Sequence, residues 1–323
     1  MHVRPVPDTS CEPPNQIFSG NRAVVASTEN PIVAGITITH AERVVAERPR
    51  LTKLDLVRYY EAVADVMLPH LRGRPLTLVQ CAPDVEHCRY LRHTGAARPP
   101  EQVRVVNIQE QTKVGDYMVI DRVQGLIALA QRNIVEFHTW NSTLKSLEVP
   151  DRIVFDLDPG PGVTWRTVVD AARQLRAVLR DLSLESWVKT TGGKGLHVVV
   201  PITRQRNWAI CLQFAKTVAA AIAEHHPTRY TLSFAKRDRD HKILIDYLRN
   251  NRTNTAVAAY SARAKAGAPV SMPLDWDELS SRLRPHRWTI KTAPKRIREA
   301  GDPWARYVVT RQRRPMPGRS PAS

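Results

Sequence analysis

The chain has 323 residues, 42% of them hydrophobic, and a formal net charge of +17 at pH 7. This length allows one large domain or two small ones, and a protein this basic usually binds a polyanion, most often a nucleic acid. The sequence has no run of about 18 apolar residues, and its amino terminus has no basic segment followed by an apolar one. We therefore expect neither a membrane span nor a secretory signal.

The cysteines form no Cys-x-x-Cys pair, and those near His87 and His93 fit no common zinc spacing. We therefore expect reduced thiols and a cytoplasmic protein. The four cysteines are Cys11, Cys81, Cys88 and Cys211.

Both ends of the sequence differ in composition from its middle. Residues 1–35 are rich in Pro, Ser, Thr and Asn and lack an apolar period, which is typical of a tail or a loosely docked arm. From about residue 282 the sequence becomes heavily basic. We expect one folded domain over residues 36–300 and a basic carboxyl-terminal tail over 301–323, which ends in a disordered arm from Pro315.

The first ordered helix is predicted by Thr52-Lys53-Leu54-Asp55, which is typical of a capping box with Asp in place of Glu. The apolar spacing extends this helix to about His70. Lys53 in the first turn opposes the charge preference of a helix amino terminus. Either the lysine faces an anion that also contacts the helix end, or it is an ordinary solvated side chain.

The next part of the chain alternates predicted strands with predicted helices. In one strand Glu136 and His138 share a face, although a lone histidine on a strand is usually only hydrogen-bonded. The predicted strands cover residues 75–80, 103–108, 117–120 and 134–138, and the predicted helices begin at the caps Asp121, Thr164 and Asn207.

The segment Val154–Pro159 is typical of a buried strand that runs into a Pro-Gly-Pro-Gly turn. Asp156 and Asp158 lie on the same face of this strand, about 7 Å apart by strand rise. Two carboxylates at this spacing suit Mg²⁺ or Mn²⁺. The alternative is a solvent-facing sheet edge that carries two surface acids.

A third acid, Asp246, lies in the apolar strand predicted over residues 242–247. An ionised carboxylate among Ile, Leu and Tyr is costly unless it is paired or binds a metal. Asp246 is therefore a candidate partner of Asp156 and Asp158.

Between two predicted strands lies a glycine-rich turn, Thr191-Gly192-Gly193-Lys194-Gly195, followed by His197. Its glycines allow backbone N–H groups to approach an anion, and Lys194 adds a charge. The spacing differs from a Walker A loop, and a plain hairpin turn is the alternative. Further on, Arg249, Asn250, Asn251, Arg252 and Arg263 supply side chains suited to phosphates.

These motifs, in this order, resemble the polymerase domain of bacterial DNA ligase D, a member of the archaeo-eukaryotic primase superfamily, over roughly residues 36 to 300. The matching motifs are His40-x-x-Arg43, Leu51-Thr52-Lys53, Glu136-x-His138-x-Trp140, Asp156-Leu157-Asp158-Pro159, the run from Lys189 to His197, the run from Asp246 to Asn250, and Tyr260-Ser261-x-Arg263.

The resemblance implies an α/β (α+β) fold: a primase-like catalytic core with mixed and antiparallel sheets and an RRM-like module flanked by helices. It also implies a DNA-directed nucleotidyltransferase of non-homologous end joining, which extends 3′ ends at gaps, breaks or overhangs and often prefers ribonucleotides. Two Mn²⁺ or Mg²⁺ ions would serve as cofactors for an in-line transfer.

The resemblance also assigns roles to residues. The metal ligands and catalytic acids would be Asp156, Asp158 and Asp246. The nucleotide would contact Thr191, Gly193, Lys194, His197, Arg249, Arg263 and His138. The DNA and the downstream 5′-phosphate would contact Lys53, Arg43 and His40.

Two departures from the family pattern matter. Where the family often has Phe-Phe-Gln-Lys-His, this chain has Arg89-Tyr90-Leu91-Arg92-His93, so only Tyr90 remains for base stacking. No Lys-x-Asp-Gly nucleophile of an ATP-dependent ligase is present. We therefore expect a stand-alone polymerase that works with a separate ligase and, by analogy, a Ku-type protein.

Three other functions remain open. A primase would start strands without a primer. A non-catalytic end-bridging factor would keep the basic surface, but acids at its centre would weaken phosphate binding. A metal-dependent nuclease would need only the Asp-x-Asp pair, although the arginines and the glycine-rich turn favour triphosphate binding.

Overall fold

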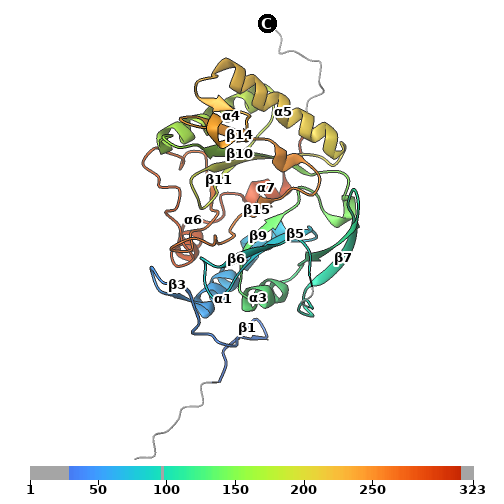
Figure 1. Ribbon diagram of the computed structural model, residues 1–323, viewed down its shortest axis with the longest axis vertical. Coiled ribbons are helices and arrows are strands. Elements are labelled where there is room, and N and C mark those ends of the chain that lie inside the picture. Colours follow the sequence, from blue (N-terminus) through green and yellow to red (C-terminus); the bar gives the residue numbers. More distant parts are fainter. Residues whose placement is uncertain (1–28, 96–97, 314–323) are drawn as a thin grey trace, which may run out of the picture.

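The computed structural model describes residues 29–95 and 98–313, which fold around two main antiparallel β-sheets with helices on their outer faces (Figure 1). The first sheet has the order β13-β14-β10-β12-β11-β16, and only the β13–β14 pair is parallel. Helices α4 and α5 cover it, at the top of Figure 1. Its elements are β10 (Arg152–Pro159), α4 (Trp165–Asp181), β11 (Trp187–Thr190), β12 (Leu196–Pro201), α5 (Trp208–His225), β13 (Tyr230–Thr231), β14 (Ile243–Asp246) and β16 (Pro273–Leu274).

The second sheet has the order β15-β9-β5-β8-β7, with β6 paired to β5. Helix α3 packs on β9, and α1 packs on α3, in the lower half of Figure 1. Its elements are α1 (Lys53–Ala62), α2 (Ala64–Leu71), β5 (Leu76–Cys81), β6 (Cys88–Leu91), β7 (Arg104–Gln109), β8 (Val114–Val119), α3 (Val123–Gln131), β9 (Ile134–Thr139) and β15 (Ala256–Val257). The mixed α/β fold with antiparallel sheets expected from the sequence is confirmed.

Short elements complete the fold. Strands β1 and β2 pair with each other, as do β3 and β4. These elements are β1 (Ile32–Val33), β2 (Ile36–Thr37), β3 (Val44–Ala46), β4 (Leu51–Thr52), the 3₁₀ turns η1 (Leu144–Ser146), η2 (Lys236–Asp238) and η3 (Leu248–Asn250), α6 (Ala293–Ala300) and α7 (Ala305–Val309).

The helix predicted from residue 53 to about residue 70 is two helices. The capping box is confirmed, since Thr52 Oγ1 accepts from the Asp55 N–H at 3.2 Å and Asp55 Oδ2 accepts from the Thr52 N–H at 2.9 Å. The helical chain breaks at Val63, which ends α1 and precedes α2. The apolar pattern continues across the break because both helices face the same core, and therefore it could not reveal the break.

Helix caps were predicted with mixed success. Thr164 and Asn207 cap α4 and α5 as expected. The prediction for Asp121 is wrong, because Arg122 precedes α3. The Asp121 carboxylate instead accepts from the Gly73 N–H at 2.9 Å and pairs with Arg104 at 2.8 Å. It therefore fastens the chain after α2 to the sheet.

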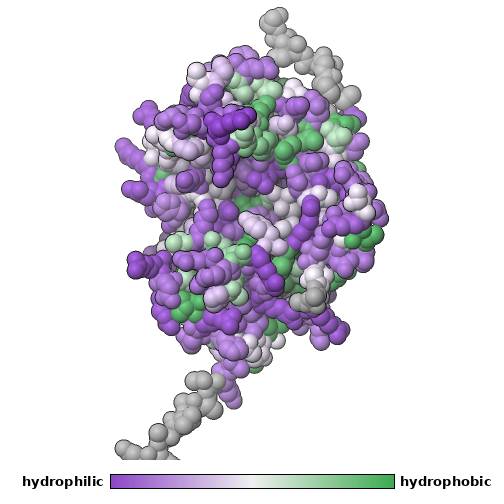
Figure 2. Space-filling model, viewed as in Figure 1, coloured by the Kyte–Doolittle hydropathy of each residue, from purple (hydrophilic) through white to green (hydrophobic). Residues whose placement is uncertain are grey.

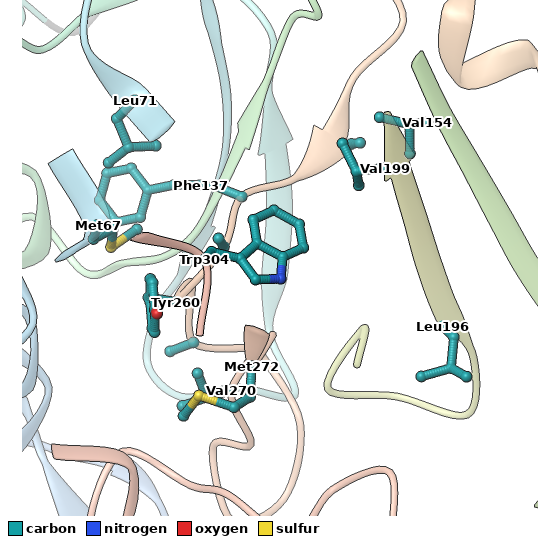
Figure 3. Packing of buried hydrophobic residues seen from close by; sticks show 14 of the residues in the cluster. Met67, Leu71, Phe137, Val154, Leu196, Val199, Tyr260, Val270, Met272 and Trp304 are labelled. Atoms are coloured by element: carbon teal, nitrogen blue, oxygen red, sulfur yellow. The ribbon is translucent and has the colours of Figure 1, made fainter. Parts of the chain in front are cut away.

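The carboxyl-terminal boundary predicted at residue 301 is wrong for the part that the structure describes. Trp304 and Tyr307 are buried, with exposed fractions of 2% and 7%. Figure 3 shows the Trp304 indole between Phe137 on one side and Val199 on the other, which belong to different sheets. At the amino terminus, β1 falls inside the predicted tail. The remainder of that tail, residues 1–28, and the predicted arm from Pro315 lie outside the described residues.

The expectation of reduced thiols is wrong for two cysteines. Cys81 and Cys88 are register partners on β5 and β6 with Cα atoms 4.1 Å apart, and they form a disulfide. Directly opposed positions on antiparallel strands bring the two side chains within bonding reach. Cys211 is buried on α5 and is not part of this disulfide, and Cys11 lies outside the described residues. Within residues 29–95 and 98–313, no helix is both long and apolar enough to cross a membrane.

Candidate functional site

Four charged or titratable residues form one row across the first sheet. Lys189 on β11 is the register partner of His197 on β12, His197 that of Asp156 on β10, and Asp156 that of Asp246 on β14. Register partners on neighbouring strands project to the same face of a sheet. We call these four residues the cross-strand row. Asp158 lies two positions further along β10 and shares the face.

Asp156 is the centre of this row. Its Oδ2 lies 3.4 Å from His197 Nε2 and 3.2 Å from Arg249 Nη2. Burial alone would raise the pKa of Asp156, but His197 and Arg249 hold it well below its ordinary value. The carboxylate is therefore ionised, and two neighbours stabilise its charge.

Asp246 shares the same arginine. Arg249 Nε lies 3.0 Å from Asp246 Oδ2, and the Leu248 N–H donates to Asp246 Oδ1 at 2.8 Å. Burial raises the pKa of Asp246, and the nearby charge of Asp156 adds to that rise. Two largely buried acids therefore lie side by side, bridged by one guanidinium.

Asp158 has a partner that sequence reasoning missed. Its Oδ2 forms an ion pair with Arg239, which lies just after η2 and 81 residues further along the chain. Each of the three acids thus contacts an arginine. Among residues 29–95 and 98–313, no three His, Cys, Asp or Glu side chains come close enough together to hold a metal ion.

The chemistry of the donors nevertheless fits a hard divalent cation, because carboxylate oxygens are the ligands that Mg²⁺ and Mn²⁺ prefer. Each of the candidate ligands Asp156, Asp158 and Asp246 has its Oδ2 atom in contact with an arginine. A cation would therefore compete with Arg249 and Arg239 for these oxygens.

The glycine-rich turn after β11 packs closely against β10. A Cβ on Gly195 would lie 2.3 Å from the Leu157 carbonyl oxygen, so only glycine allows this approach. Thr191 Oγ1 donates to the Gly195 carbonyl at 3.1 Å and accepts from the Gly193 N–H at 3.2 Å. The hydroxyl of Thr191 therefore shapes the turn, while the side chain of Lys194 is exposed.

The second sheet contributes His138, which is tied to Arg263 through Glu136. Glu136 Oε2 lies 2.7 Å from His138 Nε2 and 3.0 Å from Arg263 Nε, and the Ala264 N–H donates to Glu136 Oε1 at 2.7 Å. Burial would raise the pKa of Glu136, but His138 and Arg263 lower it to about 2. One buried carboxylate thus fixes two candidate nucleotide contacts.

Most of these side chains, but not that of the predicted site residue Asp246, line one pocket of about 270 Å³ between the two sheets. It brings together most of the residues predicted from the sequence, and it adds Lys265, whose Nζ lies 2.8 Å from the position of a Cβ on Gly193. The predicted residues that line it are His138, Asp156, Asp158, Thr191, Gly193, Lys194, His197, Arg249 and Arg263.

Three other candidates near Arg249 have different roles. Asn250 is buried, and its side chain pairs with both backbone groups of Val154, at 2.8 and 2.7 Å. Arg252 pairs with Glu148 at 2.7 Å, away from the pocket. Neither these two nor Asn251 line the pocket, so the structure does not bring them together there with Arg249 and Arg263. Asn250 instead holds the strand that carries Asp156.

Lys53 is not a solvated lysine. Its exposed fraction is 3%, and its Nζ donates to the Thr39 carbonyl at 2.7 Å. Burial, with a smaller contribution from Arg43, lowers the pKa of Lys53. The Lys53 N–H donates to the Arg43 carbonyl at 2.8 Å, which places these residues and His40 at one corner outside the pocket.

Tyr90 on β6 lies close to His138, which lines the pocket. Its side chain is exposed, and its ring centroid is 6.4 Å from that of His138. An exposed aromatic ring at this place is available for stacking with a base.

Sequence reasoning named Lys189 only as the start of a matching motif and gave it no role, and it did not name Lys265 or Arg239. Lys189 could have been predicted, because a charged lysine in an apolar strand, like the charged Asp246, is costly unless it has a partner. It is buried, donates to Ser271 Oγ at 2.6 Å, and has a pKa well below its ordinary value because of burial and Arg263. Lys265 and Arg239 lie in exposed loops, where the sequence has no signal that distinguishes them from other basic residues.

The sequence matches the family model "LigD, primase-polymerase domain" over residues 52–304. The "Multifunctional non-homologous end joining protein LigD" of Pseudomonas aeruginosa is 36% identical over 299 residues, which is 91% of this chain and 35% of that protein. The "Bifunctional non-homologous end joining protein LigD" of Bacillus subtilis is 26% identical over 91% of this chain and 48% of its own length. The chain therefore spans between a third and a half of these relatives.

A solved structure shows the same fold. It is the "Polymerase Domain from Mycobacterium tuberculosis Ligase D in complex with DNA", which aligns with a TM-score of 0.78 and 30% sequence identity. The alignment covers 85% of this chain and 98% of that one.

Proposed function

This chain belongs to the family of LigD primase-polymerase domains, and on that premise we propose that it adds nucleotides to DNA 3′ ends during non-homologous end joining. The observation that supports this proposal is the cross-strand row beside a pocket with basic walls. Carboxylates next to Lys194, Arg263 and Lys265 suit a ligand that carries both phosphates and bound cations.

In this proposal Asp156, Asp158 and Asp246 would hold Mn²⁺ or Mg²⁺, as two ions. Such ions would neutralise the triphosphate and activate the primer 3′-hydroxyl. The protein's own groups have separate tasks. His197 and Arg249 stabilise the charge of Asp156, and Glu136 holds His138 and Arg263 at the pocket wall.

The phosphates would meet Lys194, Arg263, Lys265 and the backbone of the glycine-rich turn around Gly193, with Thr191 holding the shape of that turn. Because Arg249 contacts the acids, it would turn towards a phosphate when a cation takes its place. Tyr90 would stack on a base, and the corner of Lys53, Arg43 and His40 would bind the 5′-phosphate across a gap.

The finer features belong to the same proposal. The substrates would be DNA gaps, breaks or overhangs and nucleoside triphosphates, with ribonucleotides preferred over deoxyribonucleotides. The partners would be a Ku-type protein and an ATP-dependent DNA ligase. The protein would act in the cytoplasm, at the nucleoid.

The test is extension of a gapped duplex with a 5′-phosphate in the presence of Mn²⁺, comparing ATP with dATP. We expect templated addition by the wild type, loss of addition in Asp156→Ala, and retained DNA binding. Asp181→Ala at the exposed end of α4 is the matched control and should extend normally.

Two other results would change the assignment. Synthesis on single-stranded DNA from free nucleotides alone would favour a primase. DNA binding without any addition by the wild type would favour an end-bridging factor, in which the arginines rather than cations neutralise the three acids.

A further inference from the structure

The segment of residues 282–298 carries seven lysines and arginines and no acid. We propose that this basic segment is a docking surface for duplex DNA on the downstream side of the gap. The inference rests on the proposed function, because it places DNA relative to the proposed 5′-phosphate corner. The seven residues are Arg282, Arg284, Arg287, Lys291, Lys295, Arg296 and Arg298.

The basic segment is fixed to the core. Its backbone is anchored by four buried side chains, which are Leu283, Trp288, Ile290 and Ala293. The cations between and beside these residues are therefore attached to an ordered backbone. All of the cations except the half-buried Arg296 are exposed. Ordered cations bind a rigid polyanion without the full entropic cost of fixing a flexible arm.

Most of this charge is not neutralised within the protein. Arg296 pairs with Glu278, Lys291 with Asp55, and Lys295 with Glu299 at 3.7 Å. Among the described residues, the other four have no acidic partner. These four are Arg282, Arg284, Arg287 and Arg298.

The position of the basic segment links the pocket to the 5′-phosphate corner. The Val270 N–H donates to the Trp288 carbonyl at 2.8 Å and the Ile290 N–H to the Ala268 carbonyl at 3.1 Å, so residues 288–290 run beside the loop that carries Lys265. On the other side, Lys291 Nζ lies 2.5 Å from Asp55 Oδ1, in the same helical turn as Lys53. DNA held at Lys53 would therefore reach the basic segment next.

The views agree with this placement. Figure 1 shows α6 on the same side of the molecule as β3, close to the start of α1. That side is predominantly hydrophilic in the space-filling view of Figure 2. A cationic surface that continues from the corner along α6 is available to a rod-shaped ligand.

The side chains favour double-stranded over single-stranded DNA. Single strands are usually bound by exposed aromatic rings on which bases stack. Apart from His286, the segment has one aromatic residue, Trp288. Its side chain is only 8% exposed and is covered by the guanidinium groups of Arg287 and Arg296. Exposed arginines and lysines without an aromatic stacking surface bind the phosphate backbone of a duplex.

The test compares two gapped DNAs that share the primer, the gap and the 5′-phosphate. They differ in the length of the downstream duplex, which is about 5 or about 15 base pairs. The longer duplex is about 50 Å long at 3.4 Å per base pair. The variant is Arg284→Glu with Arg298→Glu. The control is Arg180→Glu with Lys216→Glu, which makes the same charge change on exposed positions of α4 and α5. Affinity is measured by fluorescence anisotropy over a range of salt concentrations.

We expect the wild type to bind the longer duplex more tightly, and the Arg284/Arg298 variant to lose about tenfold on it, with the salt slope reduced by about 2. Affinity for the shorter duplex should stay within about twofold, and the control should bind both DNAs like the wild type. Equal losses on both DNAs, or equal losses in the control, would overturn the proposal, as would a loss confined to single-stranded DNA.

This measurement needs no nucleotide addition, so it separates the two proposals. Length-dependent binding without extension would contradict the proposed function alone. Normal extension with no dependence on duplex length would contradict the docking surface alone.

Discussion

Asp156 and Asp246 are register partners on β10 and β14, and Arg249 contacts Oδ2 of both. The arginine therefore neutralises the acids in the same place where a divalent cation would bind. This relationship makes the ionic state of the site a competition between one guanidinium and metal ions, and it can be tested directly.

Replacement of Arg249 by Gln should release both carboxylates for metal binding. We expect Mn²⁺ to bind about tenfold more tightly without nucleotide, because its competitor is gone, and nucleotide addition to fall about 100-fold, because a phosphate contact is lost. Electron paramagnetic resonance titration of free Mn²⁺ measures the first effect. Arg252→Gln, whose partner is Glu148, is the control and should bind Mn²⁺ like the wild type. Weaker Mn²⁺ binding in Arg249→Gln would contradict the competition.

Glu136→Gln should affect nucleotide binding more than DNA binding. Glu136 is buried and joins His138 to Arg263, so the uncharged amide leaves Arg263 without its counter-charge. We expect KM for the nucleotide to rise about tenfold, which is typical for the loss of a supporting contact. Steady-state extension at varied nucleotide concentration measures this, and an unchanged KM would show that Glu136 serves folding alone.

The Arg74–Asp151 ion pair should make stability fall in acid. Asp151 accepts from Arg74 at 2.9 and 3.0 Å and from Arg204 at 2.9 Å. Burial alone would raise the pKa of Asp151, but these arginines lower it from 3.8 to about 2. Because the folded-state pKa is the lower one, the contribution is complete above about pH 4 and is lost as the pH falls towards 2.

Asp151→Asn should therefore lower the free energy of unfolding by about 3 kcal/mol at pH 7, since it leaves a buried guanidinium without its partner. The difference from the wild type should shrink between pH 4 and pH 2. Urea unfolding at several pH values measures both effects, with Glu148→Gln in an exposed pair as the control. A difference that stays constant with pH would refute the assignment.

Lys53→Met should reduce the preference for a phosphorylated gap. The methionine retains much of the side-chain volume of this buried residue while it removes the charge. We expect the ratio of affinities for gaps with and without a 5′-phosphate to fall about tenfold, a charge-assisted contact being worth about 1.5–3 kcal/mol. An equal loss on both substrates would make Lys53 a general backbone contact.

The sequence was sufficient to predict most of the pocket, because the acids, the glycine-rich turn and His197 lie in short motifs whose local geometry follows from the period of a strand. It was insufficient wherever an interaction depends on long-range register. The Glu136–Arg263 pair spans 127 residues and the Asp158–Arg239 pair 81, and nothing local in the sequence shows that these residues pair.

The same reason explains the errors. Strand β6 was not predicted because Arg89-Tyr90-Leu91-Arg92 lacks apolar alternation, and without β6 the pairing of Cys81 with Cys88 could not be expected. The basic composition after residue 282 obscured the apolar contacts of Trp304 and Tyr307, which extend the fold beyond the predicted boundary.

The burial of Trp304 gives the carboxyl-terminal end of the domain a mechanical connection to its centre. The indole Nε1 donates to the Val188 carbonyl at 3.1 Å, and the next residue on β11 is Lys189, the first member of the cross-strand row. Further along the chain, the Gln312 carbonyl accepts from the Thr203 N–H at 2.8 Å, and its side-chain amide donates to the carbonyls of Glu185 and Pro201 at 2.8 and 3.1 Å. Tension applied to the chain after residue 313 would therefore load Gln312 first, and Trp304 with β11 only afterwards. A force large enough to release Gln312 would next act, through Trp304, on β11, which carries Lys189 and pairs with the strand of His197.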